Sequence, residues 1–195
     1  MSAVTARQRL AGMLPDELTA QQRELYEAIA GGRRAQGPQL FPLVDEAGRL
    51  RGPFNAMLLS PALGGPLQAV GAAVRYEAQL TDRERELAIL IVAARWASNF
   101  EWDSHQAIAR HVGLSDEEIG SIRASGPVPF TDPREAAVVE WTRQLADAWA
   151  ADDATYPSAQ AALGLAVMYE LTVLVGYYST LALQLRVFLG EEGPA

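Results

Sequence analysis

Residues 81–94 read TDRERELAILIVAA, a polar turn that leads directly into an apolar run. Thr81 and Glu84 have the spacing of a capping box, in which a hydroxyl and a carboxylate each satisfy a backbone N–H at a helix start. The apolar run from Leu87 to Ala94 is typical of a helix that is buried in a core. This segment therefore predicts a buried helix over residues 82–97.

The segments on either side also predict helices. Ser115 and Glu118 repeat the capping box, while Asp132-Pro133 and Ser60-Pro61 place proline in a first turn, where its missing N–H costs nothing. Elsewhere apolar residues recur at helical spacing, without the alternating segments that strands would show. We therefore predict an all-α protein, a compact multi-helix bundle. The expected helices cover residues 16–30, 54–60, 61–78, 82–97, 99–112, 115–124, 132–150 and 157–189, the last with a break near Pro157 or Gly164.

The first 50 residues differ from the remainder, because they are more polar and richer in glycine and proline. They are too short to form a core of their own. We expect residues 1–50 to be an N-terminal extension that packs on a single helical domain, residues 51–195.

Composition excludes several classes of function. The net charge of −8 disfavours nucleic acid as a partner, and the densest basic spot, Arg33-Arg34, is interpreted as solvated loop charge. The sequence has no cysteine, which excludes thiolate and iron–sulfur chemistry. Two histidines without an Asp-rich loop predict no metal site, and Gly64-Gly65 lacks the context of a phosphate loop. No cofactor is expected.

The chain is expected to be cytoplasmic and free of membrane spans. Its first 18 residues lack the continuous apolar core of a secretory signal. Residues 161–189 are the most apolar stretch, but Glu170, Gln184 and Arg186 interrupt it. A helix that is buried or faces another subunit is therefore favoured over a membrane span.

His105 is the candidate centre of the chemistry. It follows Glu101 by four residues and Ser98 by seven, so all three share one face of a helix. A carboxylate beside an imidazole fixes its tautomer and gives a proton donor and acceptor for use near neutral pH. The alternative is an exposed Glu101–His105 pair that only stabilises the helix, since such a pair would have the same spacing. A second carboxylate, Glu86, lies on the apolar stripe of the preceding helix and requires a partner if buried.

Four motifs resemble the carboxymuconolactone decarboxylase family, which forms one superfamily with peroxidases of the alkylhydroperoxidase-D type. They are RGPFNAML at residues 51–58, LTDREREL at 80–87, EWDSH at 101–105 and LVGYY at 174–178. The resemblance implies an alkylhydroperoxidase-D-like bundle with a long apolar C-terminal helix. It also implies a homo-oligomer (dimer, trimer or hexamer), for which helix 161–189 would supply the interface.

In the peroxidase branch, the resemblance implies a relay of a glutamate, a Cys-x-x-Cys pair and a histidine. Glu86 and His105 occupy the glutamate and histidine positions, whereas the two cysteine positions fall on Ser98 and Glu101. Without thiols, peroxidase chemistry is excluded.

In the decarboxylase branch, the resemblance implies a carboxy-lyase that converts a carboxylated muconolactone into an enol-lactone in aromatic-compound catabolism. His105 would protonate carbon or stabilise an enolate, and Glu86 and Glu101 would relay the proton. We therefore expect a cofactor-free enzyme that decarboxylates or isomerises a small (carboxy)lactone. The alternative is a non-catalytic protein that binds a small molecule in the family pocket.

Five further residues are candidates for binding the substrate: Ser98, Trp102, Arg51, Asn55 and Tyr177. Trp102 could wall the pocket or pack in the core, and Arg51 would suit a substrate carboxylate or lie on the surface. Tyr177 and Tyr178 are neighbours in the last helix, and the sequence does not decide which of them reaches the site. His111 lies on another helical face, where contact with the helix C-terminus is expected.

Overall fold

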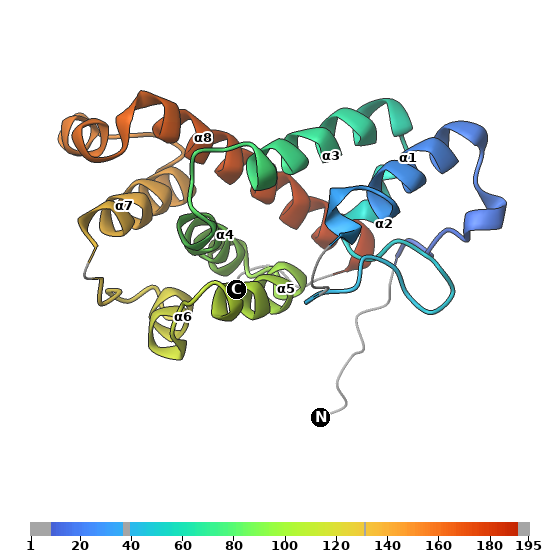
Figure 1. Ribbon diagram of the computed structural model, residues 1–195, viewed down its shortest axis with the longest axis horizontal. Helices are drawn as coiled ribbons and strands as arrows, with labels where there is room; N and C mark the ends of the chain where they lie inside the picture. Colours follow the sequence, from blue (N-terminus) through green and yellow to red (C-terminus); the bar gives the residue numbers. More distant parts are fainter. Residues whose placement is uncertain (1–8, 37–39, 131, 191–195) are drawn as a thin grey trace.

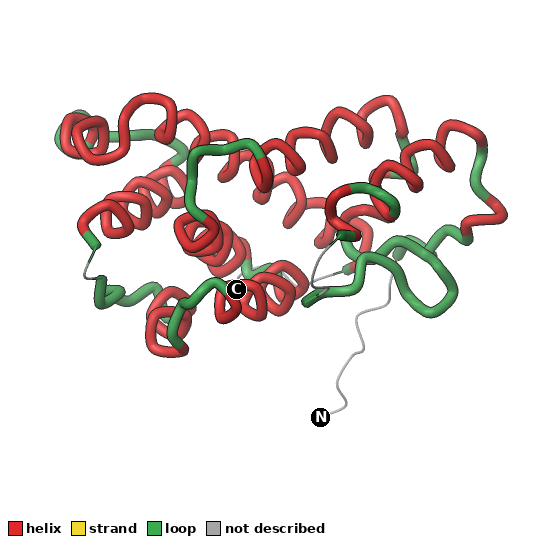
Figure 2. The backbone as a smooth tube through the Cα atoms, viewed as in Figure 1, coloured by secondary structure: helices red, strands yellow, loops and turns green. Residues whose placement is uncertain are grey.

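The computed structural model describes residues 9–36, 40–130 and 132–190, and within these ranges the protein is helical, with one isolated bridge between Val44 and Leu50. Figure 1 shows the arrangement of the helices, and Figure 2 shows the loops that join them. The all-α prediction is confirmed. The helices are α1 (Ala20–Ala30), α2 (Pro53–Met57), α3 (Pro61–Tyr76), α4 (Asp82–Trp96), α5 (Asn99–His111), α6 (Asp116–Arg123), α7 (Pro133–Ala148) and α8 (Tyr156–Gln184).

Helix α4 lies at the centre of the fold. Every residue from Glu84 to Ala93 is buried, because α5, α7 and α8 pack around it. The predicted capping box is present, since the Thr81 hydroxyl accepts from the Glu84 N–H and the Glu84 carboxylate accepts from the Thr81 N–H. An apolar run preceded by a cap therefore produced the expected helix, and it carries Glu86 in the interior.

The N-terminal part of the chain shares the core of the helical body. Leu18, Leu25 and Ile29 belong to the same apolar cluster as the residues of α4 and α8. Helix α1 begins at Ala20, later than expected, because Thr19 and Gln22 form a capping box there, while residues Pro15–Glu17 make a separate 3₁₀ turn. Phe41, in the segment before α2, contacts Phe100 at the start of α5, with 5.1 Å between the ring centroids.

Helix α8 is the longest element, and it breaks at Gly164, where φ is 75°. Of the two positions predicted for a break, Pro157 and Gly164, the structure has the second, and Pro157 lies in the first turn of the helix. The helix ends in one turn of π-helix, Leu185–Leu189. Among the described residues, Tyr156–Leu189 is the one helix whose length and composition would suit a membrane, and 39% of its most apolar window is buried in the protein. Its buried side supplies Tyr177 and Tyr178 to the site described next.

Candidate functional site

Glu86 and His105 form a buried hydrogen-bonded pair between α4 and α5. The Glu86 Oε2 atom lies 2.7 Å from His105 Nδ1, and Glu86 is 1% exposed. The other carboxylate oxygen, Oε1, lies 3.7 Å from Arg85 Nε. A carboxylate this deeply buried needs charged or hydrogen-bonding partners, and these two neighbours supply them.

The contact with Glu86 orients the imidazole ring. With Nδ1 held by the carboxylate, Nε2 is the ring nitrogen left for a ligand, and no other described residue hydrogen-bonds it. Tyr178 packs edge-on against the ring, with centroids 5.3 Å apart. A fixed ring with one nitrogen on a carboxylate is the arrangement of a general acid or base.

His105 lines a cavity of about 100 Å³ that is partly open to solvent. Helix α5 contributes Glu101, Ser104, His105 and Ile108, which share one face at the i, i+3, i+4 and i+7 spacing. The predicted common face of Glu101 and His105 is therefore present. Glu86 is behind His105 and does not line the cavity, so it acts on a ligand only through the imidazole.

Two arginines bring positive charge to the cavity wall. Arg34 comes from the loop after α1 and hydrogen-bonds Gln68 Oε1 at 2.8 Å, so it is not the solvated loop charge that the sequence suggested. Arg75 comes from the last turn of α3, and its guanidinium makes no hydrogen bond or ion pair to any residue in the described ranges. A guanidinium in this position is suited to a carboxylate.

Both tyrosines of the Tyr177-Tyr178 pair line the cavity. Burial raises the pKa of Tyr177 to about 12. The positive charge of Arg34 lowers this pKa in part, and the negative charge of Glu101 raises it further. Burial also raises the pKa of Tyr178, and the nearby charges of Glu86 and Glu101 add to this. Both phenols therefore stay protonated at neutral pH and can donate hydrogen bonds.

Two glycines let aromatic groups approach the backbone around the cavity. A Cβ atom on Gly71 would overlap the Tyr177 hydroxyl, and one on Gly52, whose φ is 60°, would overlap the Phe100 ring. Phe100 in turn packs edge-on against Phe41 of the N-terminal loop, at 5.1 Å between centroids. The N-terminal segment thus forms part of the cavity wall, through Arg34, Leu40, Phe41 and Leu43.

The remaining predicted binding residues lie away from the cavity wall. Ser98 is the buried N-cap residue of α5. Trp102 is 4% exposed and packs in the core, with the Arg123 guanidinium 4.7 Å from its ring. Asn55 hydrogen-bonds the backbone of Met13 and Ala11, which ties down the N-terminal segment, and Arg51 is exposed, 5.2 Å from the Phe41 ring.

Sequence reasoning did not find Arg34 and Arg75, and it did not decide between Tyr177 and Tyr178, both of which line the cavity. Arg34 comes from a loop remote in sequence, and Arg75 was one of many surface-type arginines. No local spacing marks either one. Among the described residues, no group of three or more acidic, histidine or cysteine side chains could hold a metal ion.

The two buried phenols predict an alkaline loss of stability. Because unfolding exposes Tyr177, the unfolded chain releases its proton near pH 10 while the folded chain holds it to about pH 12. The stabilisation is complete below pH 10 and is lost as pH rises. We expect Tyr177 to lower the free energy of unfolding by roughly 1.4 kcal/mol between pH 8 and pH 11, and Tyr178 to add to this fall. Urea denaturation at both pH values measures this change.

Two variants isolate the contribution of Tyr177. In Tyr177→Phe, the free energy of unfolding should fall less between pH 8 and pH 11, because the contribution of Tyr177 is removed. In Tyr169→Phe, at a residue 71% exposed, it should fall as much as in wild type. The sequence contains no lysine, so tyrosines dominate side-chain titration in this range. An identical pH dependence in wild type and Tyr177→Phe would contradict the assigned pKa.

Comparison with known proteins finds a family match over the region that contains the Glu86–His105 pair. Residues 61–144, from α3 into α7, match the Carboxymuconolactone decarboxylase family. The fold is similar to that of a protein of unknown function from Agrobacterium tumefaciens, for which a role in antioxidant defence as an AhpD protein has been suggested. The TM-score is 0.62 at 21% identity, covering 74% of this chain and 99% of the other. No curated protein is significantly similar in sequence.

Proposed function

We propose that the chain, whose residues 61–144 match the carboxymuconolactone decarboxylase family, is a cofactor-independent acid–base enzyme. Its proposed substrate is a small carboxylated lactone or a related metabolite of aromatic-compound catabolism in the cytoplasm. The observation that carries the proposal is the His105 imidazole, which is held by the buried Glu86 at 2.7 Å and lines a partly open cavity.

The proposed reaction is a decarboxylation in which the lactone carbonyl of the substrate accepts the electron pair of the broken bond, so that no cofactor is needed. The bond from carbon to the leaving carboxylate breaks, carbon dioxide departs, and the electron pair enters the conjugated lactone carbonyl. A proton from His105 Nε2 is then delivered to the carbon next to that carbonyl, which leaves the double bond of the enol-lactone at the carbon that lost its carboxylate, and solvent restores the proton of His105. The chain has neither lysine for a Schiff base nor cysteine for a thiol relay. An isomerisation would use the same proton transfer without loss of carbon dioxide.

Arg75 and Arg34 fit the binding of an anionic substrate. Both line the same cavity as His105, and Tyr177 can donate a further hydrogen bond. A carboxylate held by these groups places the reacting carbon against the imidazole, which lowers the entropic part of the barrier. This assigns to Arg75 and Arg34 the role that the sequence suggested for Arg51.

The size of the cavity limits what it encloses. At about 100 Å³ it is smaller than the roughly 150 Å³ of a protein cavity that binds benzene. The enclosed part therefore suits the reacting end of a substrate, and the rest of a larger lactone would extend through the open side. A compact carboxylated five-membered lactone is the best first probe.

Arg75→Met tests the binding role of this residue. It keeps most of the side-chain volume but removes the charge, so the KM for a carboxylated lactone should rise by roughly tenfold or more, with a smaller change in kcat. Steady-state kinetics on a panel of carboxylated lactones measure both constants. Arg123→Met, which removes a guanidinium that lies over Trp102 outside the cavity, is the matched control. An unchanged KM in Arg75→Met would remove Arg75 from the binding site.

The same panel separates an enzyme from the alternative, a protein that only binds a small molecule. Calorimetric binding of a carboxylated lactone without turnover would support the binding protein. Turnover with release of carbon dioxide would support the carboxy-lyase, and turnover without it would support an isomerase.

A further inference from the structure

The lactone carbonyl oxygen gains negative charge during the proposed decarboxylation. The electron pair of the broken bond rests on this oxygen until carbon takes the proton from His105. Hydrogen-bond donors that are already in place around such an oxygen are usually a large part of catalysis. Arg34 and Arg75 hold the substrate carboxylate in this reaction, so the donor to the carbonyl oxygen must be another group of the cavity wall.

The cavity wall offers few other side-chain donors. The Ser104 hydroxyl already donates to a backbone carbonyl of its own helix, at 2.7 Å. The negatively charged carboxylate of Glu101 accepts hydrogen bonds. The Tyr177 hydroxyl lies with the Arg34 guanidinium beside Gly71, because a Cβ added there would overlap both groups. Tyr177 therefore belongs to the part of the cavity that binds the substrate carboxylate.

The Tyr178 hydroxyl is the remaining side-chain donor. It lines the same cavity and makes no hydrogen bond to any described residue. It is also open to the cavity, because the unpartnered polar atoms that are sealed from solvent in the described ranges do not include it. Tyr178 as a whole is 8% exposed. A ligand that fills the cavity is therefore the natural acceptor for this hydroxyl, with little water to compete for it.

The ring of Tyr178 is held in place by two aromatic contacts. It meets the His105 ring edge-on, with 5.3 Å between centroids, and the Tyr177 ring edge-on, with 5.2 Å. A donor that is fixed before the reaction needs no reorganisation when charge develops. The contact with His105 also puts the phenol beside the imidazole. In the lactone, the carbon that takes the proton and the carbonyl oxygen are two bonds apart, so one small ring can contact both residues.

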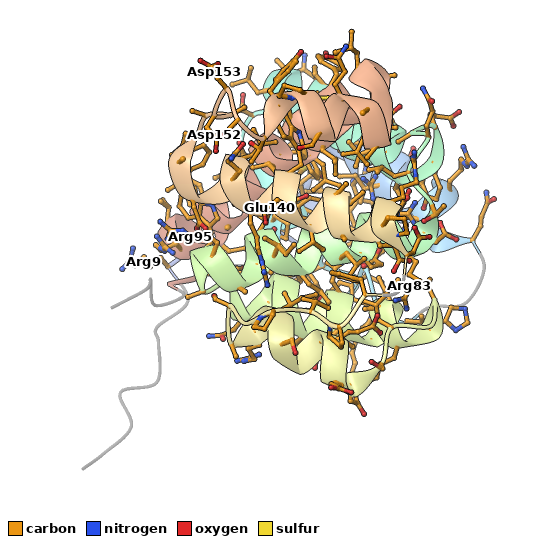
Figure 3. All side chains as sticks on the ribbon, turned by 90° about the vertical axis from the view of Figure 1, so that its left-hand side faces the viewer. Arg9, Arg83, Arg95, Glu140, Asp152 and Asp153 are labelled. Atoms are coloured by element: carbon orange, nitrogen blue, oxygen red, sulfur yellow. The ribbon has the colours of Figure 1, made fainter. Side chains whose placement is uncertain are left out.

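The surroundings of Tyr178 favour a strong hydrogen bond. Burial raises the pKa of Tyr178, which keeps the phenol protonated at neutral pH, and the positive charge of Arg75 lowers this pKa in part. In contrast, charged residues labelled in Figure 3, such as Glu140 and Asp153, are exposed on the outside of the protein, where water weakens their interactions. A hydrogen bond donated inside the cavity is stronger than one on that surface.

We propose that Tyr178 is a catalytic residue, whose hydroxyl donates a hydrogen bond to the lactone carbonyl oxygen as the carboxylate leaves. The bond from carbon to the carboxylate breaks, its electron pair moves through the conjugated ring onto the carbonyl oxygen, and the Tyr178 proton stays on the phenol oxygen. The pair then forms the bond between carbon and the proton from His105 Nε2. This role rests on the proposed function, because the oxygen belongs to the substrate of that reaction.

Tyr178→Phe tests this role by removing only the hydroxyl. The variant should fold, since it keeps both ring contacts and loses no hydrogen bond within the described residues. Its kcat for a carboxylated lactone should fall by roughly 10²-fold with little change in KM. Tyr177→Phe should instead raise KM with a smaller change in kcat. Tyr169→Phe, at a residue 71% exposed, is the matched control and should keep both constants of wild type.

The kinetics distinguish this role from the proposed function. Full kcat in Tyr178→Phe, beside a large loss in His105→Gln, would overturn the role of Tyr178 and leave the proposed function standing. A wild type that turns over no carboxylated lactone would contradict the proposed function, and a binding measurement would then decide the role of Tyr178.

This binding measurement uses tetronic acid, a five-membered lactone that ionises to a stable enolate at neutral pH. It presents a negatively charged oxygen without any reaction. By calorimetry, Tyr178→Phe should bind tetronate roughly tenfold or more weakly than wild type and Tyr169→Phe, as expected for the loss of a hydrogen bond to a charged group. Equal affinities of wild type and Tyr178→Phe, or no binding of tetronate to wild type, would overturn the proposal.

Discussion

Replacing His105 by glutamine is expected to lower turnover of a carboxylated lactone by roughly 10²- to 10⁴-fold, the usual contribution of a general acid or base. Glutamine keeps a hydrogen-bonding group opposite Glu86 but cannot carry a proton at neutral pH. Because Arg34 and Arg75 are untouched, substrate binding should change little. The loss should therefore appear in kcat.

The comparison needs a variant that removes a histidine elsewhere on α5. His111 is exposed at the end of the same helix, outside the cavity, so His111→Gln should keep the turnover of wild type. Steady-state kinetics with calorimetric binding of the same lactone would separate chemistry from binding. Equal turnover by His105→Gln and His111→Gln would remove His105 from the mechanism.

Glu86→Gln is expected to have the second large effect, although Glu86 does not touch the cavity. It is a positioning residue, which acts by holding His105 Nδ1. The same carboxylate-to-amide change behind the histidine of serine proteases costs about 10⁴-fold in turnover, because the imidazole adopts the wrong tautomer. We expect a loss of at least roughly 10²-fold here, since the amide can present its NH₂ group to Nδ1.

A structural role alone would not produce the full set of effects expected for Glu86→Gln. The kcat should fall while calorimetric binding of the lactone changes little, because Arg34 and Arg75 are untouched. Glu84→Gln is the matched control, because Glu84 is also buried on α4 but hydrogen-bonds Thr81 N and Arg134 Nε instead. It should lower the free energy of unfolding and leave the kcat unchanged. A Glu86→Gln enzyme with full turnover would contradict the positioning role.

The helices were predictable where a cap or a proline marks their first residue. Thr81 with Glu84, Ser115 with Glu118, and Asp132 with Pro133 each begin a helix as expected. The first α-helix was predicted to begin at residue 16 and not at Ala20, because the Thr19 and Gln22 capping box was overlooked. Helix ends were less accurate. Helix α7, for example, ends before Trp149, which adopts a left-handed conformation without the glycine that usually marks such an end.

The candidate site was predictable to the extent that it lies within one helix. Glu101 and His105 share a face because their spacing requires it. Trp102, one residue after Glu101, points about 100° away around the helix, which accounts for its place in the core. Arg34 and Arg75 join the site only through the packing of the N-terminal loop and α3 against α5. Such contacts leave no periodic signal in the sequence.

Incorporation of deuterium from solvent is the most direct measurement of proton transfer by the His105–Glu86 dyad. Wild type would be incubated in D₂O with a carboxylated lactone, and the product would be examined by mass spectrometry and NMR. The account predicts that wild type and His111→Gln form product with one deuteron on the carbon next to the lactone carbonyl, where the enolate is protonated, and that His105→Gln forms this product at least roughly 10²-fold more slowly. Labelled product formed at equal rates by wild type and His105→Gln, or product with no deuteron on that carbon, would contradict it.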